Sequence, residues 1–280
     1  MTSRTPTCVL TPSGTEVRHG HDPDAFVEIG SLTKVLTGTL LTRLAAQGVL
    51  SPDDPLDRWL DTVPATGITL GQLADHTSGL PRLPPGICPF DPYRAFTGQA
   101  LRELLPRLGS LCTAPPGSRE LYSNFGYSVL GYALAVAGGR PYPELLDELV
   151  LAPLGLTGLV TAAPPAGRRL LARGLFGRPR TPWTMDGAIL PAGGLWATPR
   201  AAARLLTGLL LDRALGDPAP SWQRAGALTW HNGATGTASV FAGAFPDGRW
   251  VLVHRLGGRH RTTDRLAIER LRGLTAGAPG

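Results

Sequence analysis

Hydrophobic positions in residues 31–47 recur with the period of a helix rather than with the alternation of a strand. The repeating apolar residues are Leu32, Val35, Leu36, Leu40, Leu41, Leu44 and Ala45. Gly48 follows directly, and a glycine in this place indicates where the helix ends. Because apolar residues cover much of the circumference, we expect this helix to lie buried at the centre of the protein.

Segments near both ends of the chain have the pattern of strands. Residues 7–10 and 15–19 are separated by Pro-Ser-Gly and predict an edge hairpin. Later strands are predicted at residues 227–230, 238–245 and 250–256, and a final amphipathic helix at 263–274. Pro-Asp-Gly-Arg at 246–249 predicts the turn between the last two strands.

Between the two ends, short helical segments alternate with loops rich in proline and glycine. The predicted helices are residues 69–75, 99–108, 126–137, 142–151 and 199–211. The longest loop, residues 80–93, contains five prolines. Since a loop of this length is uncommon in a compact protein unless it covers a site, we expect it beside the functional cleft.

Strands at both ends with helices between them predict an α+β fold, with one antiparallel sheet assembled from the two chain ends. The 280 residues, 42% of them hydrophobic, can bury a sizeable core. We expect one domain, residues 1–280, in which 1–30 and 221–280 form the sheet part and 31–220 the mainly helical part. The sequence contains no fixed repeat, GxGxxG or P-loop, so it does not support nucleotide binding.

The composition singles out one residue. Of the 27 basic residues only Lys34 is lysine, and asparagine occurs only at Asn124 and Asn232. This is the bias of a GC-rich genome, which replaces lysine and asparagine codons wherever chemistry permits. Arginine serves solubility equally well but cannot readily lose its proton, so the one retained lysine indicates a chemical role.

Charge and cysteine content limit the partners and the compartment. The net charge is +6, but the arginines are scattered without a basic run, so nucleic-acid binding is not expected. Cys8, Cys88 and Cys112 lack CxxC spacing and indicate free thiols in a reducing compartment. No metal-ligand spacing occurs, and no metal or cofactor is expected. Without an export signal or a membrane-spanning stretch, we expect a cytoplasmic protein with no membrane partner.

Lys34 follows Ser31 by three positions, in Gly-Ser-Leu-Thr-Lys at 30–34. Residues at this spacing share a helix face, so the Ser31 hydroxyl and the Lys34 amine can meet. A buried lysine at a helix N-terminus has a lowered pKa, which suits a proton acceptor for a serine nucleophile. The alternative is that Ser31 only caps the helix, although a cation in the first turn opposes the helix dipole.

Both asparagines lie in further tripeptides, Tyr122-Ser123-Asn124 and His231-Asn232-Gly233. SxxK, YxN and a Lys/His-x-Gly triplet in this order resemble the serine penicillin-recognising superfamily. The chain is most similar to the class C β-lactamase branch, with its esterase, D-amino-acid peptidase and acyltransferase relatives. His-Thr-Ser-Gly-Leu-Pro at 76–81 and the stretch 116–131 match this branch as well, and the likeness covers residues 5–275. It implies a β-lactamase/transpeptidase-like fold.

The resemblance also implies roles for the motif residues. Ser31 is the nucleophile that forms an acyl-enzyme, and Lys34 holds its proton or passes it on. Tyr122, with a phenol pKa lowered by nearby cations, is the general base and later the acid for the leaving group; Lys34 competes for the role of base. Asn124 bridges Lys34 and the acyl side of the substrate, and His231 opens the third triplet.

The same resemblance implies the remaining contacts. The backbone N–H groups of Ser31 and Ala234 form the oxyanion hole. Asn232 and Gly233 contact the substrate. Independently of the resemblance, the aromatic and apolar content of the loop 80–93 and of the stretch 176–196, with Trp183 and Trp196, predicts that both line the cleft; the alternative is that these residues only anchor the loops.

Three of the motif residues have simpler interpretations. Tyr122 could be a core tyrosine with a satisfied hydroxyl. Asn232-Gly233 could be a type I′ turn, because Asn-Gly is the strongest hairpin dipeptide. His76 is expected to be structural and to bind nearby backbone.

Two departures from the family bear on the substrate. Penicillin-hydrolysing members usually carry lysine where His231 stands, and a histidine with a pKa of about 6.5 is mostly neutral. This favours an ester, thioester or amide without an obligatory carboxylate. Ser31 also lies only 30 residues into the chain, which predicts a more open cleft.

These features together predict a serine acyl hydrolase that acts on a small-molecule acyl substrate, a metabolite of secondary metabolism. Acyl transfer or intramolecular cyclisation through the same acyl-enzyme is the first alternative. A non-catalytic scaffold or binding protein with the same fold is the second. The oligomeric state is left open.

Overall fold

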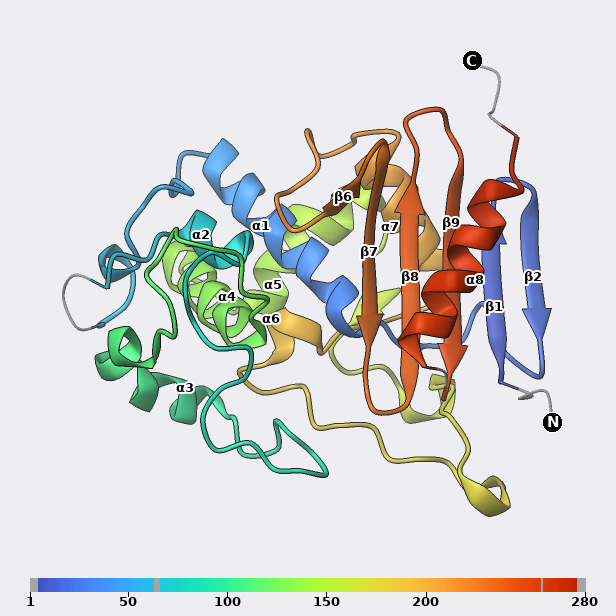
Figure 1. Ribbon diagram of the computed structural model, residues 1–280, viewed down its shortest axis with the longest axis horizontal. Coiled ribbons are helices and arrows are strands. Elements are labelled where there is room, and N and C mark those ends of the chain that lie inside the picture. Colours follow the sequence, from blue (N-terminus) through green and yellow to red (C-terminus); the bar gives the residue numbers. More distant parts are fainter. Residues whose placement is uncertain (1–4, 63–65, 258, 276–280) are drawn as a thin grey trace.

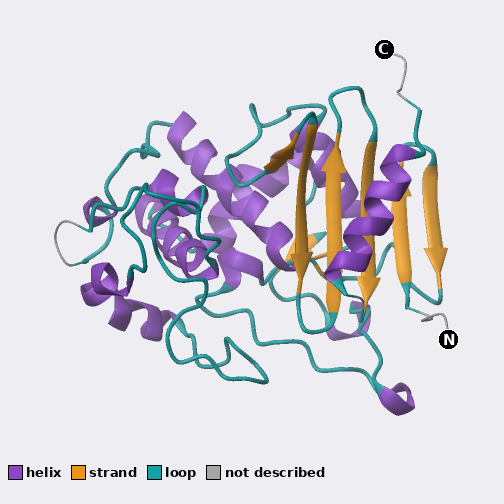
Figure 2. Cartoon of the chain, in the orientation of Figure 1, coloured by secondary structure: helices purple, strands orange, loops and turns teal. Residues whose placement is uncertain are grey.

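The computed structural model describes residues 5–62, 66–257 and 259–275; the other positions of the predicted domain lie outside the described residues. Most of the helices gather on one side and the strands of the main sheet on the other, where the C-terminal helix lies across one face of the sheet (Figure 2). The main sheet has six antiparallel strands in the order β2-β1-β9-β8-β7-β6. Their bounds are β1 Thr7–Thr11, β2 Gly14–Arg18, β6 Gln223–Ala225, β7 Leu228–Ala234, β8 Ala238–Ala244 and β9 Trp250–Leu256.

The two chain ends meet inside this sheet, as the sequence predicted. Strand β1 pairs with the C-terminal strand β9, with Cys8 opposite His254 (Figure 1). Successive side chains of β9 point to opposite faces of the sheet. Leu252 joins the main core, whereas Val251 and Val253 pack under helix α8. Burial on both faces explains why β8 is buried at every position.

All helices except the short α6 form where periodicity predicted them. They are α1 Thr33–Ala46, α2 Leu70–Ala74, α3 Gly98–Leu104, α4 Asn124–Gly138, α5 Tyr142–Leu146, α6 Leu190–Gly193, α7 Pro199–Leu210 and α8 His260–Arg272. Helix α1 is buried along its first nine residues, from Thr33 to Leu41. The prediction of a buried central helix is therefore confirmed.

Four helices of the structure begin at a residue whose side chain caps the helix. Thr69, Thr97, Ser123 and Thr198 each accept a backbone N–H of the following helix. Ser31 does not: it lies within a 3₁₀ turn, Gly30–Leu32, and the residue before α1 is Leu32. The alternative that Ser31 caps the helix is wrong, and its hydroxyl is available for another partner.

A second, small sheet was not predicted. It consists of β3 Val27–Glu28, β5 Trp196–Ala197 and β4 Val160–Thr161 in the order β3-β5-β4. Two-residue strands carry no alternation that a sequence pattern could reveal. The short helix α6 was missed for the same reason. Helix α6 matters to the site because the carbonyl oxygen of its Ala192 accepts a hydrogen bond from Lys34.

The cysteines of the described chain are free thiols, as predicted: Cys8 is buried, Cys112 half-buried and Cys88 exposed. None of the helices formed by the described residues is long and apolar enough to cross a membrane.

Candidate active site

Ser31 lies at the edge of a cavity of about 560 Å³ between the helical part and the sheet. Three regions supply its walls: the turn before α1, the loop at 80–93 with the start of α4, and the edge of β7. Trp183 and Met185 close the cavity from the segment before α6. The proline-rich loop lines this cavity through Arg82, Leu83, Pro92 and Tyr93, beside the predicted nucleophile.

Lys34 lies one turn beyond Ser31 and is completely buried. Its Nζ is 3.2 Å from Ser31 Oγ, 2.8 Å from Asn124 Oδ1 and 2.5 Å from the carbonyl oxygen of Ala192. Burial lowers the pKa of Lys34 well below its usual value, and the Arg82 guanidinium lowers it further. The lowered pKa is as predicted, with burial as its main cause.

Tyr122 and Asn124 flank the N-cap of α4. The Tyr122 ring has three basic neighbours: its centroid is 4.4 Å from that of His76, 4.9 Å from Lys34 Nζ and 5.0 Å from Arg82 Cζ. The predicted lowering of its pKa is nevertheless wrong. Burial raises the pKa of Tyr122, and the hydrogen bond with Ser31 and the charge of Arg82 offset that rise only in part. At neutral pH the phenol keeps its proton.

Asn124 connects two side chains of the site. Its amide oxygen accepts from Lys34, and its Nδ2 donates to Tyr93 Oη at 2.8 Å. The predicted bridge to Lys34 is present. Tyr93 was not predicted as a site residue; its position at the end of the proline-rich loop was the available signal.

His76 has the structural role that was expected. Its Nδ1 accepts the backbone N–H of Ser123 at 3.1 Å, so the imidazole holds the loop that carries Tyr122. Burial lowers the pKa of His76 to about 3, and the Lys34 charge contributes. The ring is therefore neutral and serves as an acceptor.

The third triplet lies within strand β7 rather than in a turn. Asn232 and Gly233 pair with Phe241 and Val240 of β8, so the alternative of a type I′ turn is wrong. Asn232 and Gly233 line the cavity, as predicted. His231 faces the other way: it is buried beside Lys34, and burial lowers its pKa to about 3.

The backbones of Ser31 and Ala234 meet at the rim, where both residues line the cavity. Two glycines permit this approach. A Cβ on Gly30, whose φ is +48°, would lie 2.8 Å from Ala234 N. A Cβ on Gly233 would lie 2.2 Å from Ile29 O and 2.9 Å from Ser31 N. The two backbones thus adjoin as the predicted oxyanion hole requires.

Gly233→Ala should displace the backbone at Ser31, because no flexible side-chain end can yield to the new methyl. We expect the free energy of unfolding to fall by about 1–3 kcal/mol and acylation of Ser31 to slow by about a hundredfold. Urea denaturation and the rate of labelling by an activated ester measure the two effects. Gly167→Ala, which meets no atom within 4 Å, is the matched control; equal effects of both substitutions would contradict the assignment.

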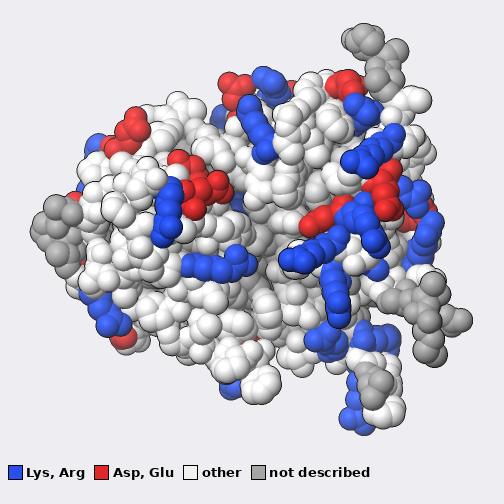
Figure 3. Space-filling model, viewed as in Figure 1, with Lys and Arg blue, Asp and Glu red and all other residues white. Residues whose placement is uncertain are grey.

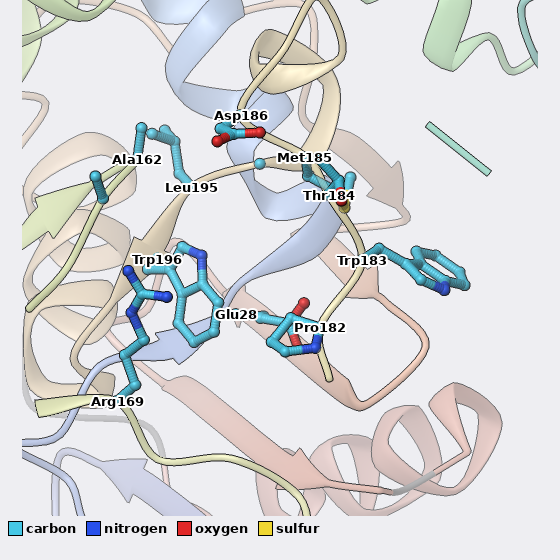
Figure 4. A pocket seen from close by; sticks show the side chains of 13 residues that line it. Glu28, Ala162, Arg169, Pro182, Trp183, Thr184, Met185, Asp186, Leu195 and Trp196 are labelled. Carbon is cyan, nitrogen blue, oxygen red and sulfur yellow. The ribbon is translucent and has the colours of Figure 1, made fainter. Parts of the chain in front are cut away.

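Trp183 lines the cavity as predicted and packs edge-on to Tyr93, with ring centroids 6.3 Å apart. Asp91 ties their two segments together by accepting from Thr184 N and Thr184 Oγ1. The expectation for Trp196 is wrong. It lies in a neighbouring cavity beside Arg169, whose guanidinium is 5.5 Å from its ring, with Glu28 opposite (Figure 4). Strand β5 turns Trp196 away from Ser31, which the sequence did not reveal.

Within the described residues, no group of three or more His, Cys, Asp or Glu side chains is arranged to hold a metal ion.

Comparison with known proteins agrees with this geometry. The model of the Beta-lactamase family matches residues 9–274. The D-alanyl-D-alanine-carboxypeptidase/endopeptidase AmpH of Escherichia coli (strain K12) is 36% identical over 183 residues, 63% of this chain and 46% of AmpH. Esterase EstB of Burkholderia gladioli is 34% identical over 158 residues, 50% of this chain and 40% of EstB. The chain thus spans less than half the length of these two relatives.

Solved structures share the fold. A beta-lactamase/D-alanine carboxypeptidase from Yersinia pestis superposes with a TM-score of 0.76 at 23% identity, covering 96% of this chain and 92% of the other. The D-amino acid amidase of Ochrobactrum anthropi SV3 superposes with a TM-score of 0.76 at 19% identity and the same coverage. The predicted β-lactamase/transpeptidase-like fold is confirmed.

Proposed function

Because this chain belongs to the Beta-lactamase family, we propose that it is a serine acyl hydrolase that works through an acyl-enzyme on Ser31. One observation carries the proposal: a buried amine, Lys34, lies between the nucleophile and two fixed carbonyl oxygens.

The contacts of Lys34 fit the neutral amine that its lowered pKa favours, whereas an ammonium would donate to all three oxygens. An ammonium has three donors and no acceptor, whereas a neutral amine has two donors and one lone pair. Asn124 Oδ1 and the Ala192 carbonyl can only accept, so they take the two N–H donors of the neutral form. The lone pair is then left for the Ser31 hydroxyl, whose oxygen lies 3.2 Å away. This arrangement, together with the lowered pKa, supports Lys34 as the general base.

Tyr122 then takes the complementary role. Burial keeps its phenol protonated, so it is a proton donor at the start of the reaction and not a phenolate base. An interaction with the Ser31 hydroxyl lowers the Tyr122 pKa in part, so the phenol lies close enough to Ser31 to protonate a leaving group there. Of the two candidates that the sequence left open for the role of base, the proposal assigns that role to Lys34 and the role of acid to Tyr122.

The proposed steps balance as follows. Lys34 accepts the Ser31 proton as Oγ bonds to the acyl carbon, and the carbonyl oxygen gains negative charge beside the N–H groups of Ser31 and Ala234. The bond to the leaving group breaks, and the leaving group takes the Tyr122 proton, which the Lys34 ammonium replaces. Water then attacks the ester on Ser31 and loses a proton to Lys34. The bond between the acyl carbon and Ser31 Oγ breaks, Oγ takes back a proton from the Lys34–Tyr122 pair, and the free acid leaves.

Hydrolysis is preferred over acyl transfer because the named relatives, a carboxypeptidase, an esterase and an amidase, are hydrolases. A non-catalytic scaffold has less support: it gives no reason to bury a lysine against a serine.

For the substrate we propose a small acyl metabolite, and secondary metabolism as its context. Trp183, Tyr93 and Leu83 give the cavity apolar walls that fit an acyl chain.

A fluorophosphonate probe tests the proposal. We expect the protein to gain the mass of one phosphonyl group on Ser31, found by intact mass and peptide mapping. Ser31→Ala should remain unlabelled. Ser110→Ala is the matched control, because Ser110 is exposed and does not line the cavity, so it should leave labelling of Ser31 in place. An unlabelled protein, or equal labelling of Ser31→Ala, would exclude the proposed nucleophile.

A further inference from the structure

A cavity of about 210 Å³ lies between α8 and the strands β1, β2 and β9; we call it the α8 cavity. Val9 and Leu266 line it, and both belong to the apolar layer between α8 and the main sheet. None of the described residues lines both this cavity and the Ser31 cavity. A molecule bound in the α8 cavity would therefore leave the catalytic site free.

The α8 cavity is basic. Its lining includes four arginines and one glutamate, which are Arg18, Arg255, Arg265, Arg270 and Glu269. On the face shown in Figure 3, basic side chains gather over α8 and the strands beside it. Glu16, outside the lining, forms ion pairs with Arg18 and Arg270. Glu269 is 3.8 Å from Arg265, at the limit of an ion pair. In the described chain, the four guanidinium groups thus meet two carboxylates, which leaves two positive charges in excess.

Arg255 is the arginine of this cavity whose charge no carboxylate of the described residues neutralises. It is half-buried in β9, opposite Thr7 of β1, and its Nε lies 3.4 Å from Thr7 Oγ1. Its Nη1 is buried, and none of the described residues accepts a hydrogen bond from it. Because a buried charged donor without an acceptor is costly, this position favours an acceptor from outside the chain.

Arg265 adds a second positive charge at the same place. Burial lowers the pKa of Arg255, and the nearby charge of Arg265 lowers it further. The two guanidinium groups therefore repel each other, and an anion between them would replace this repulsion by two charge-assisted hydrogen bonds. Thr262 lines the cavity three positions before Arg265, on the same side of α8, and its hydroxyl can donate to the same anion.

We propose that the α8 cavity binds the phosphate group of a phosphate monoester through Arg255, Arg265 and Thr262. Such a group carries a charge of about −1.5 to −2 at neutral pH and three acceptor oxygens. It therefore matches both the two excess positive charges and the three donor side chains. A carboxylate brings one charge and two oxygens, and a phosphate diester brings one charge, so both fit less well. The same group occurs on soluble metabolites and on lipid headgroups, which the experiment below distinguishes.

Titration calorimetry on the full chain tests this inference, with glycerol 3-phosphate as the probe at pH 7.5 and constant ionic strength. We expect one site per chain with a Kd on the order of 1 mM or lower. Dimethyl phosphate, a monoanion, should bind at least about tenfold more weakly, because it lacks the second charge. Equal affinity for the two compounds would contradict a site built for a monoester.

Arg255→Gln and Arg265→Gln should each weaken binding of glycerol 3-phosphate about tenfold or more, since each removes a hydrogen bond from a charged donor. Arg265 is exposed on α8, so its variant keeps the fold even if half-buried Arg255 does not tolerate substitution. Arg224→Gln is the matched control. It removes the same charge from β6, three strands from β9, and Arg224 does not line the α8 cavity. Equal weakening in Arg224→Gln would make the effect one of net charge and overturn the site.

Vesicles of phosphatidylcholine with phosphatidic acid distinguish the source of the phosphate group. Binding of glycerol 3-phosphate that Arg265→Gln weakens supports the site with a soluble metabolite as its source. Binding to the vesicles alone, weakened in the same variant, supports it with a lipid headgroup. Binding of neither probe overturns the inference. Ser31→Ala should bind like the natural protein, so the result stands apart from whether the fluorophosphonate labels Ser31.

Discussion

Lys34→Met should lose acylation of Ser31 by about a thousandfold or more while the chain still folds. Methionine has nearly the shape of lysine and suits a fully buried position, but it cannot accept the Ser31 proton. General base catalysis contributes on the order of a hundredfold to ten-thousandfold, and Tyr122, kept protonated by burial, cannot substitute. Pre-steady-state labelling with an activated ester measures the rate, and circular dichroism checks the fold.

Lys34→Arg should be equally inactive, because a guanidinium stays protonated and has no lone pair to offer. Arg43→Met is the control on the same helix. It lies nine positions further along α1, about 13 Å from Lys34 by helical rise, and should label like the natural protein. An acylatable Lys34→Arg variant would refute Lys34 as the base and transfer that role to Tyr122.

The second large effect concerns pH. We expect the folded protein to lose stability steeply as the pH falls below about 6.5. Four histidines are buried: His21, His76, His231 and His254. Burial lowers the pKa of His21 to about 4 and those of the other three to about 3. His21 Nε2 and His254 Nδ1 share one hydrogen bond of 2.8 Å, which a proton on each ring would break.

The sign follows from proton uptake. Between the unfolded pKa of about 6.5 and the folded values, the unfolded chain binds more protons, so the free energy of unfolding rises with pH. Glu28 opposes this in part, because burial raises its pKa. A net uptake of about three protons near pH 5 corresponds to a slope of about 4 kcal/mol per pH unit. Against a typical total stability of about 5–15 kcal/mol, the protein should unfold in mild acid.

Urea denaturation at pH 7.5, 6.5 and 5.5 measures this slope. His254→Asn should reduce the number of protons taken up on unfolding by about one and so make the slope shallower, whatever its effect on stability at neutral pH. His19→Asn is the control, because His19 is exposed and its positive φ of 55° is one that asparagine tolerates. A free energy of unfolding that stays constant between pH 7.5 and 5 would contradict neutral buried histidines.

Much of the fold followed from the sequence because its signals are local. The period of the apolar residues at 31–47 identified the central helix, and the turn at 246–249 identified a hairpin of the sheet. The strand segments at the two ends also predicted their common sheet, since unpaired strands must find partners. What escaped prediction were elements of two to four residues, β3, β4, β5, β6 and α6, which are too short to show a period.

The sequence by itself determined which residues could do the chemistry: one lysine three positions after a serine, and the only two asparagines in the two other motifs. Tertiary structure alone decided how those residues behave. Burial, which no local pattern reports, raised the pKa of Tyr122 instead of lowering it. Strand direction turned His231 away from the cavity, and a loop anchored to α4 brought Arg82 into the wall. The sequence determines the type of each residue, whereas the pKa and the orientation of its side chain depend on neighbours that only folding brings together.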